Sequence, residues 1–242
     1  MAFNQLNEEL NDAFETYFPK MNPAVRLPYG ATTRALAWGM KARTRLFGGQ
    51  VKVNERIVEY PQILRWLPDN GSVLDIGCVS SRLPIQLASM GYTVHGVDTR
   101  PYPYTHPNFT FFRSDLFTWT PPRAYDVVCL VSVIEHFGLG GYGDLVVPDA
   151  DLQAVTKIRE WLVPGGTLLV SLPYGKADVT PKHRIYDAER LNHVFGALER
   201  VREIYYQRIN GAWMPSTAVA LADVTSPDLP PNGVAVLELR KR

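Results

Sequence analysis

The sequence predicts an α/β fold in which helices cover both faces of a mostly parallel sheet. Beyond Asn54, short apolar runs rich in β-branched residues alternate with segments whose apolar residues recur at helical spacing. This alternation is typical of successive βα units. Several of the apolar runs also end in an acid or a glycine, which indicates a ligand site at the carboxyl edge of the sheet.

The expected elements follow one another along the chain in that alternating order. Strands are expected at 72–76, 93–97, 110–113, 126–131 and 167–172, with a closing antiparallel pair at 202–209 and 233–240. Helices are expected at 58–66, 83–90, 152–162 and 188–195. Pro164, Gly165 and Gly166 are expected to end the third of these helices sharply.

Residues 1–50 are expected to form an N-terminal helical cap, and residues 51–242 one α/β domain. Apolar residues at helical spacing between Asn4 and Tyr17, and a basic face between Thr32 and Phe47, indicate two helices in the cap. Its apolar residues leave two roles open, closure over a substrate or contact between copies in a homo-oligomer. A helical pair that only packs against the sheet edge is an equally weighted alternative.

Composition limits the classes of partner. The 25 Lys and Arg against 24 Asp and Glu give a formal net charge of +1, which disfavours nucleic acid and anionic membranes. Cys78 and Cys129 lie in apolar runs and exclude a disulfide framework. The N-terminus lacks the pattern of a signal peptide, and no apolar run reaches the length of a membrane span. We therefore expect a cytoplasmic enzyme that acts on a small molecule.

Acids follow the first three expected strands. Asp75 lies in the first strand just before Gly77, Asp98 ends the second strand, and Asp115 follows the third. A glycine at such a strand end lets the backbone approach a ligand, and a carboxylate after the second strand can accept both hydroxyls of a ribose. Taken singly, each acid is better explained as a turn or helix-capping residue. The ordered set favours a nucleoside site.

This ordered set resembles the class I S-adenosyl-L-methionine (SAM)-dependent methyltransferases. Asp75 and Gly77 match the first motif of that family, Asp98 its ribose-binding acid and Asp115 its adenine-side acid. Residues 162–168, Leu-Val-Pro-Gly-Gly-Thr-Leu, match the entry to its fifth strand. The resemblance covers roughly residues 55–205. It implies a Rossmann-like seven-stranded methyltransferase sheet, SAM as cofactor, and a cofactor site completed by Leu116 and Val131.

The glycine-rich loop departs from the pattern of that family. The usual Gly-x-Gly-x-Gly is replaced by Gly77-Cys78-Val79-Ser80-Ser81, so Val79 and Ser81 carry side chains where the backbone normally approaches the cofactor. The missing glycines disfavour a dinucleotide, whose pyrophosphate needs them. They also leave open a binding module that keeps the fold without catalysis.

The segment after the fourth strand is expected to hold the chemistry. Glu135 and His136 place a carboxylate and an imidazole ahead of a glycine-rich run. Methyl transfer to a hydroxyl gains from a base, and His136 is the first candidate because imidazole titrates near neutral pH. Glu135 either orients His136 or is itself the base, and a role for His136 in only lining the cavity carries equal weight. Tyr142 and Asp144 are expected to contact the substrate.

A second polar cluster follows the fifth strand. Tyr174 and His183 are expected to contact the substrate, and His183 is also a candidate to join Glu135 and His136 as a ligand of Mg²⁺. Some small-RNA and quinone methyltransferases carry a Glu-x-x-Glu-His metal motif here, whereas Ser132 replaces the first Glu in this chain. The alternative for His183 is a solvated loop residue.

Longer matches indicate the acceptor. Segments such as 135–144 and 183–186 resemble an uncharacterised methyltransferase-like family often found among bacterial glycan-assembly proteins. That resemblance implies an O-methyltransferase acting on a hydroxyl of a saccharide or a similar polar small molecule. The alternatives are an N-methyltransferase of a small amine or nucleic acid and a non-catalytic binding module. Residues 132–135 lack the Asn/Asp-Pro-Pro-Tyr segment common in nucleobase enzymes.

Overall fold

The computed structural model of the chain describes Trp38 and residues 54–141, 146–181, 183–227 and 230–242. Asn54–Arg242 is one structural unit. Apart from Trp38, the cap expected at residues 1–50 lies outside the described residues, as do Tyr142 and Asp144, so these remain predictions.

An eight-stranded sheet with the order β3-β2-β1-β4-β5-β10-β8-β9 organises the described residues. Its parallel half consists of β1 (Ser72–Ile76), β2 (Thr93–Asp98), β3 (Phe109–Arg113), β4 (Tyr125–Val131) and β5 (Leu162–Pro173). Its antiparallel half consists of β8 (Glu199–Ile209), β9 (Ala212–Ser216) and β10 (Gly233–Arg240). Because β1 pairs with both β2 and β4, the strand order reverses there, and the carboxyl ends of these strands form the switch point at which such sheets bind ligands.

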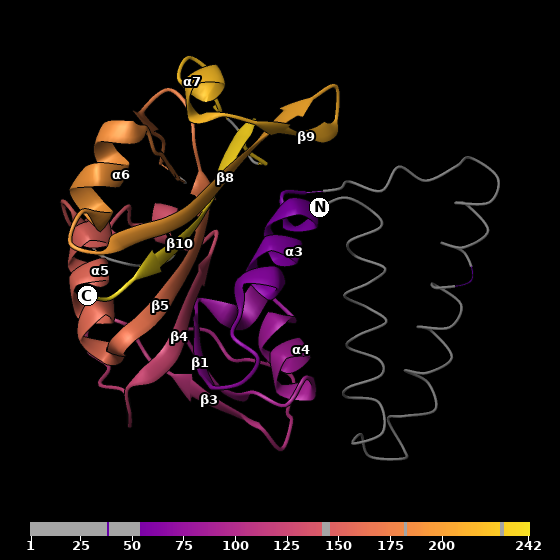
Figure 1. Ribbon diagram of the computed structural model, residues 1–242, viewed down its shortest axis with the longest axis vertical. Coiled ribbons are helices and arrows are strands. Elements are labelled where there is room, and N and C mark those ends of the chain that lie inside the picture. Colours follow the sequence, from indigo (N-terminus) through magenta and orange to yellow (C-terminus); the bar gives the residue numbers. More distant parts are fainter. Residues whose placement is uncertain (1–37, 39–53, 142–145, 182, 228–229) are drawn as a thin grey trace. The chain divides into compact units, whose positions relative to one another are not determined.

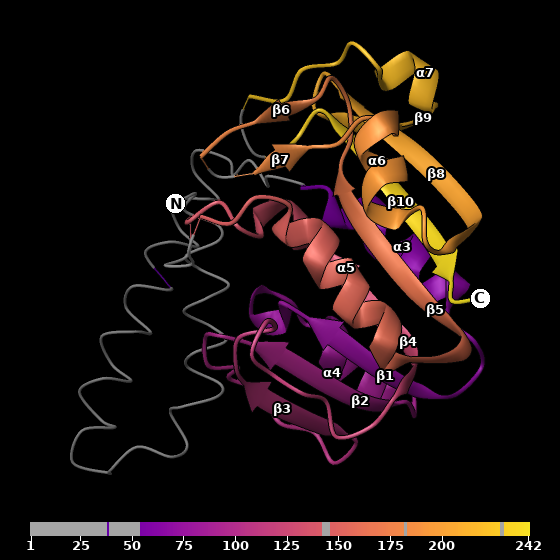
Figure 2. The same cartoon turned by 90° about the vertical axis from the view of Figure 1, so that its left-hand side faces the viewer.

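Helices cover both faces of this sheet (Figures 1 and 2). One face carries α3 (Arg56–Trp66) and α4 (Leu83–Ser89), and the other carries α5 (Ala150–Trp161) and α6 (Ala188–Phe195). The remaining short elements are η2 (Cys78–Ser80), η3 (Ile134–His136), α7 (Ala218–Leu221) and the hairpin of β6 (Asp178–Val179) with β7 (Arg184–Ile185). No helix in the described ranges combines the length and apolarity needed to cross a membrane.

Two apolar layers hold the helices to the sheet, because successive strand residues point to opposite faces. In β1, Leu74 belongs to the cluster that contains Ile158 of α5, whereas its neighbour Val73 belongs to the cluster that contains Ile63 of α3. All residues of β1 are buried. A strand covered on both faces carries apolar residues toward both, as Val73 and Leu74 do, which is why β1 was recognisable in the sequence.

The predicted α/β fold is confirmed, with two differences in its main sheet, while α7 and the β6–β7 hairpin are short elements that were not predicted. The helix α5 ends at Trp161 and β5 begins at once, so residues 164–166 lie inside the strand rather than between helix and strand. Residue Gly165 there has φ +74°. The edge strand β9 was not expected, and it makes the described sheet one strand wider than the predicted seven.

Candidate active site

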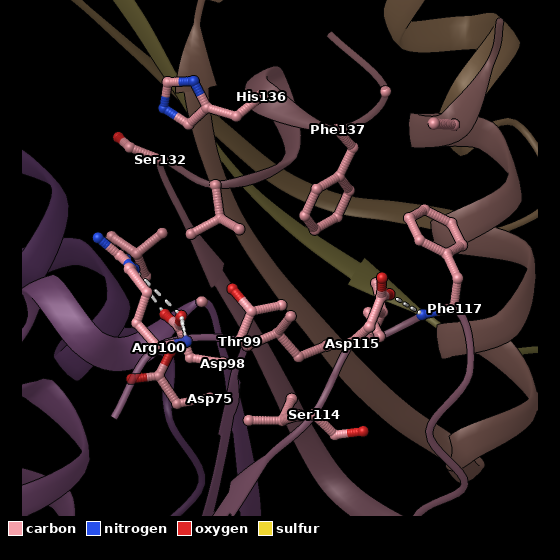
Figure 3. A pocket seen from close by; sticks show the side chains of 18 of the residues that line it. Asp75, Asp98, Thr99, Arg100, Ser114, Asp115, Phe117, Ser132, His136 and Phe137 are labelled. Atoms are coloured by element: carbon pink, nitrogen blue, oxygen red, sulfur yellow. Dashed lines mark hydrogen bonds and ion pairs between the residues drawn. The ribbon is translucent and has the colours of Figure 1, made fainter. Parts of the chain in front are cut away.

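A cavity of about 500 Å³ lies at the carboxyl ends of β1, β2, β3 and β4. This volume is in the range of small-molecule sites in proteins. The cavity is lined by all the predicted cofactor residues and by one of the two predicted catalytic residues: Asp75, Gly77, Asp98, Asp115, Leu116, Val131 and His136. Since these come from separate strands, the switch point of the sheet brings them together (Figure 3).

The end of β1 contributes a buried acid and a glycine. Asp75 Oδ2 has no hydrogen-bond partner among the described residues. Burial raises the pKa of Asp75 to about 7, an effect that nearby Asp98 adds to and Arg56 opposes. Gly77 has φ +72°, and a Cβ there would lie 2.6 Å from the methyl carbons of Val133. The glycine is therefore required both by its conformation and by the wall it faces.

The Asp98 carboxylate at the end of β2 accepts hydrogen bonds on both oxygens. Oδ1 accepts from the backbone N–H of Arg100 at 2.9 Å and from Arg100 Nε at 3.2 Å. Oδ2 accepts from the backbone N–H of Val79 at 3.0 Å and from Arg100 Nη2 at 3.2 Å. Figure 3 shows the Arg100 side chain lying over this carboxylate. Asp98 therefore stabilises the turn after β2, as the structural alternative expects, and also lines the cavity.

The end of β3 contributes an exposed acid beside apolar residues. Asp115 Oδ1 accepts from the backbone N–H of Phe117 at 2.7 Å, as expected of a capping acid. Leu116 and Phe117 line the same part of the cavity, where the Phe117 ring meets that of Phe137 at a centroid distance of 5.9 Å. This region offers an apolar wall with a carboxylate at its rim.

The residue after β4 belongs to a buried polar cluster that sequence reasoning missed. Ser132 Oγ donates to Glu59 Oε1 at 2.6 Å, and Arg56 Nη1 donates to Glu59 Oε2 at 2.6 Å. Glu59 is fully buried, whereas Arg56 and Ser132 line the cavity. Both bonds have the short distance of charge-assisted hydrogen bonds. The available signal was a charged pair at helical spacing in α3, which is more often a solvated face.

The Glu135-His136 pair is divided between the cavity and the protein interior. His136 lines the cavity, whereas Glu135 is buried behind it and does not. His136 Nε2 lies 3.8 Å from Glu135 Oε1, and Glu135 Oε2 has no hydrogen-bond partner among the described residues. Burial raises the pKa of Glu135 to about 8, so this carboxyl is mostly protonated at neutral pH. A protonated acid is a poor base and can still orient a neighbouring imidazole.

The structure does not bring the residues expected after β5 to this cavity. Tyr174 is buried against Tyr205, with ring centroids 4.8 Å apart, and does not line the cavity. The His183 ring is also buried, with Nε2 3.1 Å from the Ser226 carbonyl oxygen and Nδ1 3.2 Å from Thr180 Oγ1. These bonds hold the ring away from solvent, so His183 is not a solvated loop residue either.

The ligand set suggested for Mg²⁺ is likewise not assembled. Across the residues that the structure describes, no three His, Cys, Asp or Glu side chains are grouped to hold a metal ion. In particular, His183 does not join Glu135 and His136, because the Ser226 and Thr180 contacts fix it elsewhere.

At the level of sequence, a known family matches only part of the chain. A family model described as "Caenorhabditis protein of unknown function, DUF268" matches residues 118–212. A search of curated proteins finds no match to the chain.

Solved structures give matches over most of the described fold. A TehB-like SAM-dependent methyltransferase from Corynebacterium glutamicum is 17% identical, with 91% of this chain and 100% of that chain covered and a TM-score of 0.51. A SAM-dependent methyltransferase from Methanosarcina mazei is 14% identical, with 75% and 97% covered and a TM-score of 0.52.

A third match was crystallised with ligands. The 1,6-didemethyltoxoflavin-N1-methyltransferase from Burkholderia thailandensis, with bound 1,6-didemethyltoxoflavin and S-adenosylhomocysteine, is 15% identical. The match covers 76% of this chain and 75% of that chain, with a TM-score of 0.51. The described residues therefore adopt the Rossmann-like fold of class I SAM-dependent methyltransferases.

Proposed function

We propose that the protein transfers a methyl group from SAM to a hydroxyl of a saccharide or a similar polar small molecule. The observation that carries this proposal is the set of acids Asp75, Asp98 and Asp115, which line one cavity at the switch point of the sheet. Asp98 is assigned to the ribose, and Asp115 with Leu116 to the adenine side. The fold shared with SAM-dependent methyltransferases supports the assignment.

The cavity suits SAM in both volume and charge. SAM carries an ammonium and a sulfonium group, and the buried Asp75 carboxyl has an oxygen without a hydrogen-bond partner among the described residues. Its pKa of about 7 means that an added cation would favour the ionised form. Asp75 and the Gly77 backbone are therefore assigned to the methionine part of the cofactor.

The residues of the chain orient the acceptor and receive its proton. SAM, when bound, supplies an electrophilic methyl carbon. His136 is assigned the proton that leaves the acceptor hydroxyl as the new bond forms, because it lines the cavity and Glu135 does not. Glu135 is assigned to positioning His136, since its pKa of about 8 keeps it mostly protonated at pH 7. Holding the two reactants in line in one cavity supplies the rest of the rate increase.

An amine acceptor is the second candidate. The Burkholderia thailandensis relative is an N1-methyltransferase, so this fold also serves nitrogen acceptors. A hydroxyl needs a base more than a neutral amine does, and the imidazole in the cavity favours the hydroxyl. Assigning the methylated atom of the product by NMR separates the two.

Calorimetric titration with SAM and S-adenosylhomocysteine, with and without Mg²⁺, tests the cofactor. Asp98→Ala is expected to weaken binding of S-adenosylhomocysteine by about 1–3 kcal/mol, the scale of lost charged hydrogen bonds. Asp223→Ala, at an exposed acid, is the matched control and should leave the affinity unchanged. Failure of the wild-type protein to bind either compound would overturn the cofactor, and unchanged affinity in Asp98→Ala would overturn the ribose assignment.

A further inference from the structure

The hydrogen bonds on Asp98 fall into two groups of two. The backbone N–H groups of Val79 and Arg100 each bond one oxygen, at 3.0 and 2.9 Å. The Arg100 guanidinium then bonds both oxygens, through Nη2 to Oδ2 and through Nε to Oδ1, each at 3.2 Å. A carboxylate has about four acceptor positions, so the backbone fixes the group and the guanidinium fills what remains.

The guanidinium makes the same pair of bonds that a ribose makes. A cis-diol donates one hydrogen bond to each oxygen of an aspartate, and so does the planar fork of an arginine. Since both need the remaining acceptor positions of Asp98, they exclude one another. Arg100 also lines the cavity beside Thr99, and Figure 3 shows its side chain against that of Asp98.

We propose that Arg100 is an internal competitor for the ribose position and that a nucleoside binds only by displacing its guanidinium from Asp98. This inference rests on the proposed function, because it assumes a ribose at Asp98. The side chain of Arg100 is 46% exposed, so it can move into solvent when displaced. The two backbone bonds do not involve the guanidinium and keep the carboxylate oriented after it leaves. Arg100 thus selects ligands that return two hydrogen bonds to Asp98.

Calorimetry with adenosine tests the competition directly. Adenosine is uncharged, so loss of the positive charge of Arg100 does not change its affinity through long-range attraction. Arg100→Ala keeps the backbone N–H and removes the competing fork, and we expect it to bind adenosine about fivefold more tightly than the wild type, the scale of a partly exposed ion pair. Adenine, which lacks the ribose, should bind both proteins equally.

Arg123→Ala is the matched control for loss of a surface arginine. Arg123 lies next to the amino end of β4, at the opposite edge of the sheet, where its Nε donates to the Ala124 carbonyl oxygen at 3.3 Å. The affinity of Arg123→Ala for adenosine should equal that of the wild type. Equal or weaker adenosine binding by Arg100→Ala would overturn the competition while leaving the nucleoside site standing. Absence of adenosine and S-adenosylhomocysteine binding in every protein would overturn the proposed function as well.

The NMR signal of the Arg100 Nε–H gives a second readout in the wild-type protein. The signal is identified by its loss in Arg100→Ala. In the free protein it should show the slowed exchange of a bonded arginine, and adenosine should return it to the position of solvent-exposed arginines. A signal that adenosine leaves unchanged at saturation would contradict displacement.

Discussion

Ser132 has φ +48°, a backbone conformation that costs a residue with a side chain about 1 kcal/mol or more. Its hydroxyl bonds Glu59, and Arg56 bonds the other oxygen of the same carboxylate. The strained residue lines the cavity at the end of β4, and the ion pair that fixes it comes from α3. Strain of this kind persists only where surrounding contacts hold the residue in place. Here the contact with Glu59 holds Ser132, which forms part of the cavity wall.

Glu59→Gln is expected to destabilise the protein by about 3 kcal/mol, because it leaves the Arg56 guanidinium without its counter-charge in a mostly buried place. The amide oxygen of Gln can still accept from Ser132, so the loss reports mainly the ion pair. Urea unfolding followed by circular dichroism measures it. Glu203→Gln, which removes an exposed partner of Arg200, should change stability by less than about 0.5 kcal/mol. Equal effects of the two substitutions would contradict this account.

His136→Ala is expected to lower turnover about 100-fold or more if the imidazole takes the proton of the acceptor. Affinity for S-adenosylhomocysteine should stay nearly unchanged, because the acids assigned to the cofactor are untouched. Turnover is measured as release of S-adenosylhomocysteine with an acceptor found by screening saccharides. His193→Ala, on the exposed face of α6, is the control. A variant with wild-type turnover would reduce His136 to a lining residue.

At the scale of elements, the turn between β1 and η2 depends on one glycine. Gly77 and Gly165 have nearly the same φ, +72° and +74°, but only Gly77 faces another side chain closely. A Cβ at Gly77 would lie 2.6 Å from the methyl carbons of Val133, whereas nothing lies within 4 Å of a Cβ at Gly165. The two positions therefore separate the conformational requirement from the steric one.

Gly77→Ala is expected to cost about 3 kcal/mol of stability, because overpacking adds to the left-handed conformation. Gly165→Ala should cost only about 1 kcal/mol, the conformational part. Since Val133 follows Ser132, the clash at Gly77 should also weaken binding of S-adenosylhomocysteine, which Gly165→Ala should leave intact. Urea unfolding and calorimetry measure both effects. Similar losses in the two variants would show that the contact with Val133 relaxes without cost.

The sequence predicted the strands that carry the acids because each is a short apolar run that ends in a polar residue. It did not predict β9, whose residues from Ala212 to Ser216 include Pro215 and alternate only weakly. The start of β5 was placed late because Pro and Gly at 164–166 are typical of a turn, although the strand continues through them. The ladder with β4 is irregular there, because β5 pairs at Leu162 and then, after a register shift, from Thr167 onward.

The candidate site also has residues that the sequence predicted and residues that it did not. Asp75 and Asp98 stand at strand ends, and His136 lies in η3 shortly after β4, so their sequence positions alone place them at the carboxyl edge of the sheet. Glu59 was missed because its meeting with Ser132, 73 residues further along the chain, depends on how α3 packs. His183 was placed in the site by its position after β5, but burial against Ser226 decided otherwise. Contacts between distant elements are set by packing, which one sequence does not show.

At the scale of the whole molecule, two buried carboxyls couple stability to pH. Burial raises the pKa of Asp75 to about 7 and that of Glu135 to about 8, well above the values of 3.8 and 4.5 for the exposed groups. At pH values between the ordinary and the raised pKa of each group, the folded protein holds a proton that the unfolded chain releases. The stability that these two groups contribute is therefore fully present below about pH 4 and is lost as the pH rises through about 7 and 8.

The expected decline is at most about 1.4 kcal/mol per pH unit for each group. Urea unfolding of the ligand-free protein at a series of pH values from 5 to 8 measures it. Glu135→Gln replaces the protonated acid with a neutral amide of the same shape, so it should flatten the decline, most clearly between pH 7 and 8. Stability that is constant or rises over this range would contradict the burial of these two acids as the cause.

The strand β10 lies between β5 and β8, although it follows both in the chain. Val236 pairs with Ser171 of β5 on one side and with Ile204 of β8 on the other. A ribosome therefore makes both neighbours before it makes the strand that joins them. Until residues 233–240 leave the exit tunnel, the nascent chain carries two open strand edges, which are sites of mispairing. Completion of the sheet, and of the apolar layers on either side of it, waits for the release of this segment.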